Sequence, residues 1–228
     1  MSDYVINAPE AAVIPVACGG GFPVRRVYCV GRNYAAHVQE MGGTVERDPP
    51  VFFQKPTDSV VQDGGTIPYP TKTADYHYEV ELVLAMKSGG LNIPQESALD
   101  HIYGYCVGID MTRRDIQGGG RPWEIAKSFD NSFPCGAIVP TEQSGHIQSG
   151  SIKLSVNGQS KQDSDVDLLI WKIPEIIANL SEYFELKAGD VIMTGTPSGV
   201  GPVISGDRIE ASVEGLPVLH VSIGPKAG

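Results

Sequence analysis

The feature that most constrains the fold is an alternating segment at residues 77–87. Apolar side chains occupy every second position, namely Tyr78, Val80, Leu82, Leu84 and Met86. The positions between them hold His77, Glu79, Glu81, Val83 and Ala85. Because successive side chains of a strand point to opposite faces, the segment predicts one β-strand with an apolar face and a face that carries two carboxylates.

The two carboxylates of this strand raise an electrostatic problem. Residues two apart on one face start roughly 6–7 Å apart, and at about 6 Å two like charges repel by roughly 3 kcal/mol at an effective dielectric near 20. The pair therefore needs a cation, a shared proton or open water. A third carboxylate, Asp110, ends the apolar strand predicted at residues 102–110.

If the three carboxylates converge, they form an all-oxygen site. Such a site favours Mg²⁺ or Mn²⁺ over zinc, and Ca²⁺ also fits. The pattern by itself equally describes a solvated Glu-x-Glu on an edge strand, followed by an unrelated aspartate. The residues alone leave both interpretations open.

Strand signals dominate the rest of the chain. Short apolar or alternating runs predict strands at residues 27–30, 51–53, 152–156, 191–194, 208–213 and 218–223. Asn157-Gly158 predicts a tight hairpin turn after residue 156. Helical spacing occurs at residues 34–41 and 173–184, and Pro174 stands at the start of the second segment. This mixture, without a regular strand–helix alternation, predicts a β-rich α+β fold.

Charge and hydropathy exclude several classes of partner. The chain has 17 Lys and Arg against 27 Asp and Glu, a formal net charge of −10. Nucleic acids and anionic membrane surfaces need a basic face, so neither is an expected partner. No apolar run approaches the ~18–20 residues that span a bilayer, and the first residues lack a basic segment typical of a secretory leader. A cytoplasmic location is therefore the expectation.

Six short motifs, in one order along the chain, resemble the fumarylacetoacetate hydrolase superfamily in its short acylpyruvate hydrolase branch. They are Tyr28-Cys29-Val30-Gly31-Arg32-Asn33-Tyr34 with His37 and Glu40, Phe53-Gln54-Lys55-Pro56, Tyr78-Glu79-Val80-Glu81-Leu82, Gly108-Ile109-Asp110-Met111-Thr112-Arg113-Arg114-Asp115, Lys127-Ser128-Phe129-Asp130, and Thr194-Gly195-Thr196-Pro197-Ser198-Gly199-Val200-Gly201. Each motif alone is weak evidence, whereas the ordered set is specific.

The resemblance implies a fold and a domain organisation. The family's fold is a mixed β-sandwich roll with few short helices, and its members are usually homodimers. Residues 1–21 are expected to form an extended N-terminal lead-in, and residues 22–228 the hydrolase core of a single catalytic domain. By resemblance, Glu79, Glu81 and Asp110 match the family's divalent-metal ligands, which implies Mg²⁺ or Mn²⁺ as the cofactor.

The resemblance also suggests catalytic and substrate-binding residues. His37 and Glu40 lie three apart, so on a helix they face each other, and a carboxylate beside an imidazole suits a general base. Lys127, among apolar neighbours, matches a catalytic position where an ammonium would hold or polarise the substrate. The alternatives are a polar surface histidine and a surface lysine with a buried stem. The positions expected around the substrate are Arg32, Tyr34, Arg113, Gln117 and Thr196.

The implied activity is metal-dependent hydrolysis of the C–C bond of a 2,4-dioxo acid. The products would be pyruvate and a carboxylic acid, and by resemblance the substrate would be fumarylpyruvate or maleylpyruvate in gentisate-type aromatic catabolism. One alternative retains the metal-held enolate but omits water, as in oxaloacetate decarboxylation or keto–enol isomerisation. An alternative of another class is a metal-stabilised binding protein without catalysis.

Overall fold

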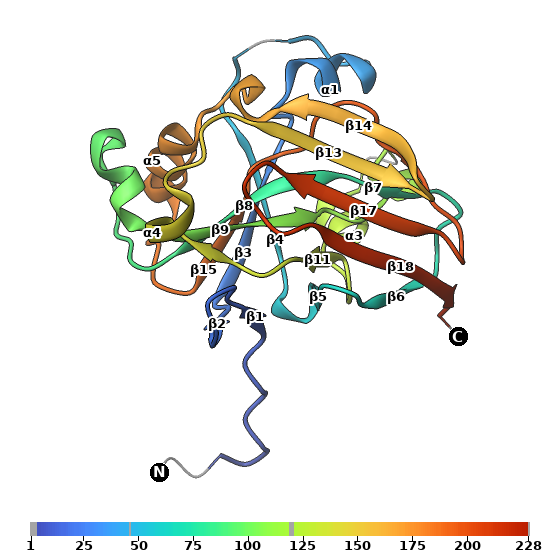
Figure 1. Ribbon diagram of the computed structural model, residues 1–228, viewed down its shortest axis with the longest axis horizontal. Helices are drawn as coiled ribbons and strands as arrows, with labels where there is room; N and C mark the ends of the chain where they lie inside the picture. The colour runs from blue at the N-terminus through green and yellow to red at the C-terminus, as the bar shows by residue number, and fades with distance from the viewer. Residues whose placement is uncertain (1–3, 46, 119–120, 228) are drawn as a thin grey trace.

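The computed structural model describes residues 4–45, 47–118 and 121–227. The described chain is rich in strands and has few short helices, as the sequence predicts (Figure 1). Two large sheets face each other, and a cluster of buried apolar side chains from both sheets forms the main core. The first three residues of the predicted lead-in lie outside the described residues.

The larger sheet is mixed and supplies most of the candidate site. Its strands run in the order β4 (Val51–Lys55), β3 (Arg26–Gly31), β15 (Asp190–Met193), β8 (Val80–Met86), β9 (Ile102–Ile109), β11 (Phe133–Cys135) and β5 (Val60–Gln62), and β12 (Val139–Pro140) also pairs with β9. All residues of β8 are buried. Leu82 and Leu84 join the main core on one face, whereas Val83 and Ala85 join a second apolar cluster on the other.

The second sheet has five strands and covers one face of the first. Its order is β14 (Gln159–Asp165), β13 (Ser151–Val156), β17 (Arg208–Val213), β18 (Leu219–Lys226) and β6 (Thr66–Tyr69). Ile152, Leu154 and Ile209 point into the main core. The predicted hairpin turn is confirmed, because Asn157 and Gly158 join β13 to β14 with positive φ angles of 52° and 77°.

The strand predicted at residues 77–87 is wrong in one respect, because it is two strands that belong to different sheets. Tyr76–Tyr78 forms β7, which lies between β10 (Thr112–Arg113) and β16 (Gly201–Pro202) in a small sheet, and β8 begins at Val80. Between them, the Glu79 carbonyl accepts from the Asp110 N–H at 2.8 Å, and the Val80 N–H donates to the Gln162 side chain at 2.9 Å. The chain therefore changes sheets at the first predicted metal ligand.

The helices are short and lie at the margins of the sheets. They are α1 (Ala35–Glu40), α2 (Arg114–Gln117), α3 (Trp123–Lys127), α4 (Thr141–Ser144) and α5 (Ile173–Tyr183), with 3₁₀ turns η1 (Thr57–Ser59), η2 (Gln95–His101) and η3 (Val166–Leu168). The two predicted helices are confirmed as α1 and α5. Helix α5 starts with Pro174 near its N-terminus and buries Ile176, Ile177 and Leu180 in the main core.

The predicted lead-in is only partly an extended arm. Residues 4–12 leave the body of the molecule (Figure 1), but β1 (Val13–Pro15) pairs with β2 (Gly21–Pro23) in a small hairpin. Ile14 and Phe22 are buried in the second apolar cluster, so this hairpin packs on the core across the predicted boundary at residue 21. Within the described ranges, the helices are too short or too polar to cross a membrane.

Candidate active site

The candidate site is a cavity of about 390 Å³ at one end of the larger sheet. Its walls come from the end of β3, helix α1, strand β4, the β7–β8 junction, the end of β9, helices α2 and α3, and the segment 194–196. Predicted site residues on these walls are Arg32, His37, Glu79, Glu81, Asp110, Gln117, Lys127 and Thr196. Residues far apart in the sequence thus meet around one space.

The three predicted metal ligands converge in this cavity. Each of Glu79, Glu81 and Asp110 offers a carboxylate oxygen, and the three oxygens lie within 4.8 Å of one another. Their exposed fractions are 4%, 2% and 1%, so the interpretation as a solvated Glu-x-Glu is wrong. Glu79 comes from the β7–β8 junction, Glu81 from β8, and Asp110 from the residue after β9.

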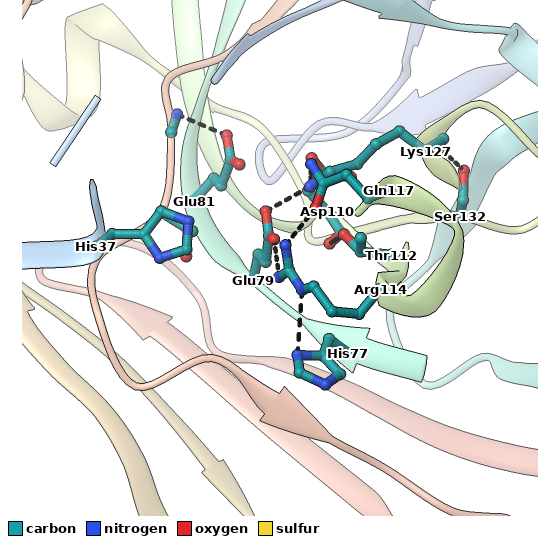
Figure 2. A network of polar contacts seen from close by, with 12 residues as sticks. His37, His77, Glu79, Glu81, Asp110, Thr112, Arg114, Gln117, Lys127 and Ser132 are labelled. Carbon is teal, nitrogen blue, oxygen red and sulfur yellow. Dashed lines mark hydrogen bonds and ion pairs between the residues drawn. The ribbon is translucent and has the colours of Figure 1, made fainter. Parts of the chain in front are cut away.

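Three cations surround two of these carboxylates. Lys127 Nζ lies 2.6 Å from Glu79 Oε2 and 2.7 Å from Asp110 Oδ2 (Figure 2). Lys55 Nζ lies 2.8 Å from Asp110 Oδ1, and Arg114 forms an ion pair with Glu79. Lys55 and Arg114 were not among the predicted site residues, although both lie within the motifs that carry the resemblance.

Glu81 has a different environment. Its Oε2 accepts the backbone N–H of Gly195 at 2.7 Å, and within residues 4–45, 47–118 and 121–227 it has no ion-pair partner. A buried carboxylate without a cation is costly. In addition, Asp110 Oδ1 accepts no hydrogen bond of good geometry from the described residues. These oxygens, all hard donors, fit a divalent cation such as Mg²⁺ or Mn²⁺.

The surroundings shift the pKa values of the two glutamates in opposite directions. Burial opposes ionisation of Glu79, but the positive charges of Lys127 and Arg114 outweigh it and hold the pKa of Glu79 well below its usual range. Burial, reinforced by the negative charges of Asp110 and Glu79, raises the pKa of Glu81 well above its usual range. In the metal-free site, Glu81 is therefore the carboxylate that most needs a cation or a proton.

Helix α1 places a histidine–glutamate pair at the wall of the cavity. His37 Nδ1 lies 3.2 Å from Glu40 Oε2, and the His37 ring faces Glu79 and Glu81 in Figure 2. Because an ionised carboxylate only accepts hydrogen bonds, this contact assigns the proton to Nδ1 and leaves Nε2 as a base. The other oxygen of Glu40 accepts the Gly199 N–H at 2.9 Å, which ties the helix to the loop after β15.

Two predicted substrate-binding residues lie outside the cavity walls. Tyr34 is 2% exposed and belongs to the main apolar core just before α1. The Arg113 guanidinium packs over the Phe129 ring at 4.1 Å and donates to the Ile125 carbonyl. The neighbouring Arg114 lines the cavity instead.

Comparison with known proteins agrees with this geometry. The model of the fumarylacetoacetate (FAA) hydrolase C-terminal family matches residues 26–223. The chain therefore belongs to this family, whose fold it shares, and it is an enzyme. The interpretation as a binding protein without catalysis is set aside.

Individual relatives give the comparison more detail. A fumarylpyruvate hydrolase from Ralstonia sp. is 45% identical over 191 residues, which cover 81% of this chain and 99% of the relative. An oxaloacetate tautomerase from Escherichia coli K12 is 41% identical over 199 residues, covering 85% and 90% of the two chains. The crystal structure of fumarylpyruvate hydrolase from Pseudomonas aeruginosa in complex with Mn²⁺ and pyruvate superposes with a TM-score of 0.95 at 47% identity, covering 98% of this chain and all of that one.

Proposed function

We propose that this enzyme is a metal-dependent hydrolase of 2,4-dioxo acids, with fumarylpyruvate or maleylpyruvate as substrate and pyruvate as one product. The observation that carries the proposal is the arrangement of one cavity, in which a buried carboxylate triad faces a histidine that a glutamate orients. The similarity to proteins named fumarylpyruvate hydrolase supports this substrate class. Gentisate-type aromatic degradation, which yields such acids, is the proposed setting.

The chemistry requires a divalent cation and suitable ligands. Glu79, Glu81 and Asp110 would hold the ion, and the buried, cation-free carboxylate of Glu81 is the donor that most favours its binding. When bound, the ion supplies a Lewis acid for the oxygens of an α-keto acid and for the negative charge that develops as the C–C bond breaks.

The residues of the chain supply the proton transfers and the positioning. His37 Nε2 takes a proton from water, and Glu40 stabilises the imidazolium that results. The ammonium of Lys127 is held charged by Glu79 and Asp110 and offers a hydrogen-bond donor to an oxygen that gains negative charge. Water then supplies a hydroxyl to the acyl carbon, and its proton balances the pyruvate enolate that leaves.

The test is release of pyruvate from a panel of acylpyruvates, with Mg²⁺ or Mn²⁺ and with a chelator. Wild-type enzyme should release pyruvate fastest from fumarylpyruvate or maleylpyruvate, and the chelator should abolish the reaction. Glu79→Ala should lose metal binding and turnover together, whereas the matched control Glu182→Ala, at an exposed position of α5, should keep both. Normal turnover by Glu79→Ala in the presence of chelator would disprove the assignment.

A second candidate function is keto–enol isomerisation of oxaloacetate. The observation that favours it is the 41% identity to an oxaloacetate tautomerase. Both reactions use an enolate of an α-keto acid, but only hydrolysis needs an activated water molecule. His37→Ala should therefore abolish pyruvate release from fumarylpyruvate. Tautomerisation of oxaloacetate, monitored as the loss of enol absorbance, should continue in this variant if Lys127 and the metal are sufficient. Efficient tautomerisation with no hydrolysis by wild-type enzyme would select this second function.

A further inference from the structure

Gln162 is a buried amide on an otherwise largely exposed strand. Strand β14 is an edge strand of the five-stranded sheet, but the side chain of Gln162 has no exposed surface. It reaches from this sheet to two parts of the candidate site. Its Oε1 accepts the Val80 N–H at 2.9 Å, and its Nε2 donates to Thr196 Oγ1 at 2.9 Å and to the Pro197 carbonyl at 2.8 Å.

These partners fix the orientation of the amide. A backbone N–H can only donate, so the side of Gln162 that faces Val80 must be the oxygen. A backbone carbonyl can only accept, so the side that faces Pro197 must be the nitrogen. Both requirements agree, and Gln162 can approach Thr196 only as a donor.

The orientation of Gln162 in turn fixes the hydroxyl of Thr196. Because Thr196 Oγ1 accepts an N–H from Gln162, the hydroxyl proton must point elsewhere. Thr196 lines the cavity with the carboxylate triad, and within the described part of the chain its hydroxyl donates to no protein acceptor. The proton is thus available to an anionic oxygen of a molecule in the cavity.

The same amide also acts on the metal-ligand strand. Val80 lies between Glu79 and Glu81, at the point where the chain passes from β7 to β8. A hydrogen bond to its N–H replaces the ladder bond that is missing at this junction. Through Val80, one side chain therefore links the backbone between Glu79 and Glu81 to a hydroxyl that lines the cavity.

We propose that Gln162 is a positioning residue that presents the Thr196 hydroxyl as a hydrogen-bond donor to the carboxylate of an α-keto acid bound beside the metal. The choice of an α-keto acid as ligand rests on the proposed function. The hydrogen-bond orientation rests only on the contacts of Gln162. The geometry assigns Gln162 no contact with substrate, so its effect passes through Thr196.

The test is a double-mutant cycle of Gln162 and Thr196, in which calorimetry measures the Kd for pyruvate at saturating Mn²⁺. Gln162→Glu keeps an acceptor for the Val80 N–H but replaces the N–H donors with an oxygen, which draws the Thr196 hydroxyl proton away from the cavity. We expect the Kd for pyruvate to rise about tenfold, as expected for a lost hydrogen bond to a charged group, and the affinity for Mn²⁺ to stay within about twofold. Thr196→Val should show a similar loss, and the double variant should lose no more than Thr196→Val alone.

The controls separate positioning from a general structural role. Gln159→Glu makes the same chemical change at an exposed position of β14 and should leave pyruvate affinity unchanged. If Gln162→Glu fails to fold, Gln162→Met carries the same cycle, with a smaller loss because the hydroxyl is then free to rotate. Unchanged affinity in the folded variant, or a loss that adds to that of Thr196→Val, would overturn the proposal.

Binding and turnover keep this proposal distinct from the proposed hydrolase activity. If wild-type enzyme binds pyruvate with the expected coupling but hydrolyses no acylpyruvate, the hydrolase function fails and the role of Gln162 stands. If acylpyruvates are hydrolysed but the cycle shows no coupling between Gln162 and Thr196, the role of Gln162 fails and the hydrolase function stands.

Discussion

The N–H of Gly199 donates to Glu40 Oε1 at 2.9 Å, across a separation of 159 residues in the sequence. The other oxygen of Glu40 holds the His37 ring at 3.2 Å. One carboxylate therefore orients the candidate base and also fastens its helix to the loop after β15. Glu40 is exposed and the ring it holds is buried, so the pair links the surface of α1 to the cavity.

The first prediction concerns the proton on His37. In Glu40→Gln, the amide oxygen should keep the bond from Gly199, which leaves the amide N–H groups facing His37. The ring must then accept at Nδ1 and carry its proton on Nε2, where it cannot accept one from water. Because general base catalysis contributes about 10²–10⁴-fold, we expect kcat for pyruvate release to fall about 100-fold while the Kd for pyruvate changes little. Gln39→Ala on the exposed side of α1 is the control, and an unchanged kcat in Glu40→Gln would refute this role.

The second prediction concerns the buried cation Lys55. Its side chain is fully buried, with Nζ 2.8 Å from Asp110 Oδ1 and 3.0 Å from Ser132 Oγ. Removing one partner of a buried ion pair typically costs about 3–5 kcal/mol, so Lys55→Met should lower the free energy of unfolding by that amount in urea titrations without metal. Lys153→Met breaks an exposed pair with Asp163 and should cost about 1 kcal/mol or less. Equal effects of the two substitutions would contradict the prediction.

Much of the fold could be predicted from local patterns. Alternation located β8, Asn157-Gly158 located the hairpin, and the apolar spacing with Pro174 located α5. Convergence of Asp110 with the Glu-x-Glu pair could also be anticipated from the sequence, although only the family resemblance favoured it over a solvated pair. The assigned roles of the site residues stay predictions.

The rest depended on interactions between distant segments. At the strand break, the Glu79 carbonyl accepts from Asp110 and the Val80 N–H donates to Gln162, and no local pattern encodes these contacts. The family resemblance favoured Arg113 over its neighbour Arg114, yet Arg113 ends β10 and packs on Phe129, whereas Arg114 begins α2 and pairs with Glu79. The change from strand to helix between these two residues thus places the Arg114 guanidinium in the site and the Arg113 guanidinium outside it.

The third prediction concerns pH and metal removal. In the metal-free protein, burial and the charges of Asp110 and Glu79 raise the pKa of Glu81 well above its ordinary value of 4.5. The folded state then keeps this proton at a pH where the unfolded chain has lost it, so the free energy of unfolding falls as pH rises from about 4.5 towards the raised pKa. A divalent cation replaces the proton, and the increase in Tm caused by Mn²⁺ should therefore be larger at pH 8 than at pH 5.5.

Glu81→Gln is the control for this pH effect. The amide oxygen can still accept the Gly195 N–H but has no titratable proton. The metal-free variant should lose the part of the pH dependence that comes from Glu81, and its Tm should rise less on addition of Mn²⁺. A Tm increase in wild-type protein that is the same at both pH values would exclude Glu81 as the carboxylate that exchanges a proton for the metal.

The fourth prediction concerns Asn33, which is 1% exposed and connects α1 to the segment that holds Glu81. Its Nδ2 donates to the carbonyls of Thr194 and Trp171, at 2.8 and 3.1 Å, and its Oδ1 accepts the Trp171 N–H at 2.7 Å. Asn33→Ala leaves the buried Thr194 carbonyl without this partner, at about 1–3 kcal/mol for such a group, and removes two half-buried hydrogen bonds to Trp171, at about 0.5–1.5 kcal/mol each. We expect the free energy of unfolding to fall by about 2–4 kcal/mol, measured by urea denaturation.

A weaker affinity for Mn²⁺ should accompany this loss of stability in Asn33→Ala. Thr194 directly precedes Gly195, whose N–H binds Glu81, so a displaced Thr194 carbonyl moves the donor that holds this carboxylate in place. Asn7→Ala, in the exposed arm, should change stability by less than about 0.5 kcal/mol and leave Mn²⁺ affinity intact. If Asn33→Ala unfolds more easily but binds Mn²⁺ as tightly as the wild type, Asn33 stabilises the fold without positioning Glu81. That result would refute the predicted effect of Asn33 on metal binding.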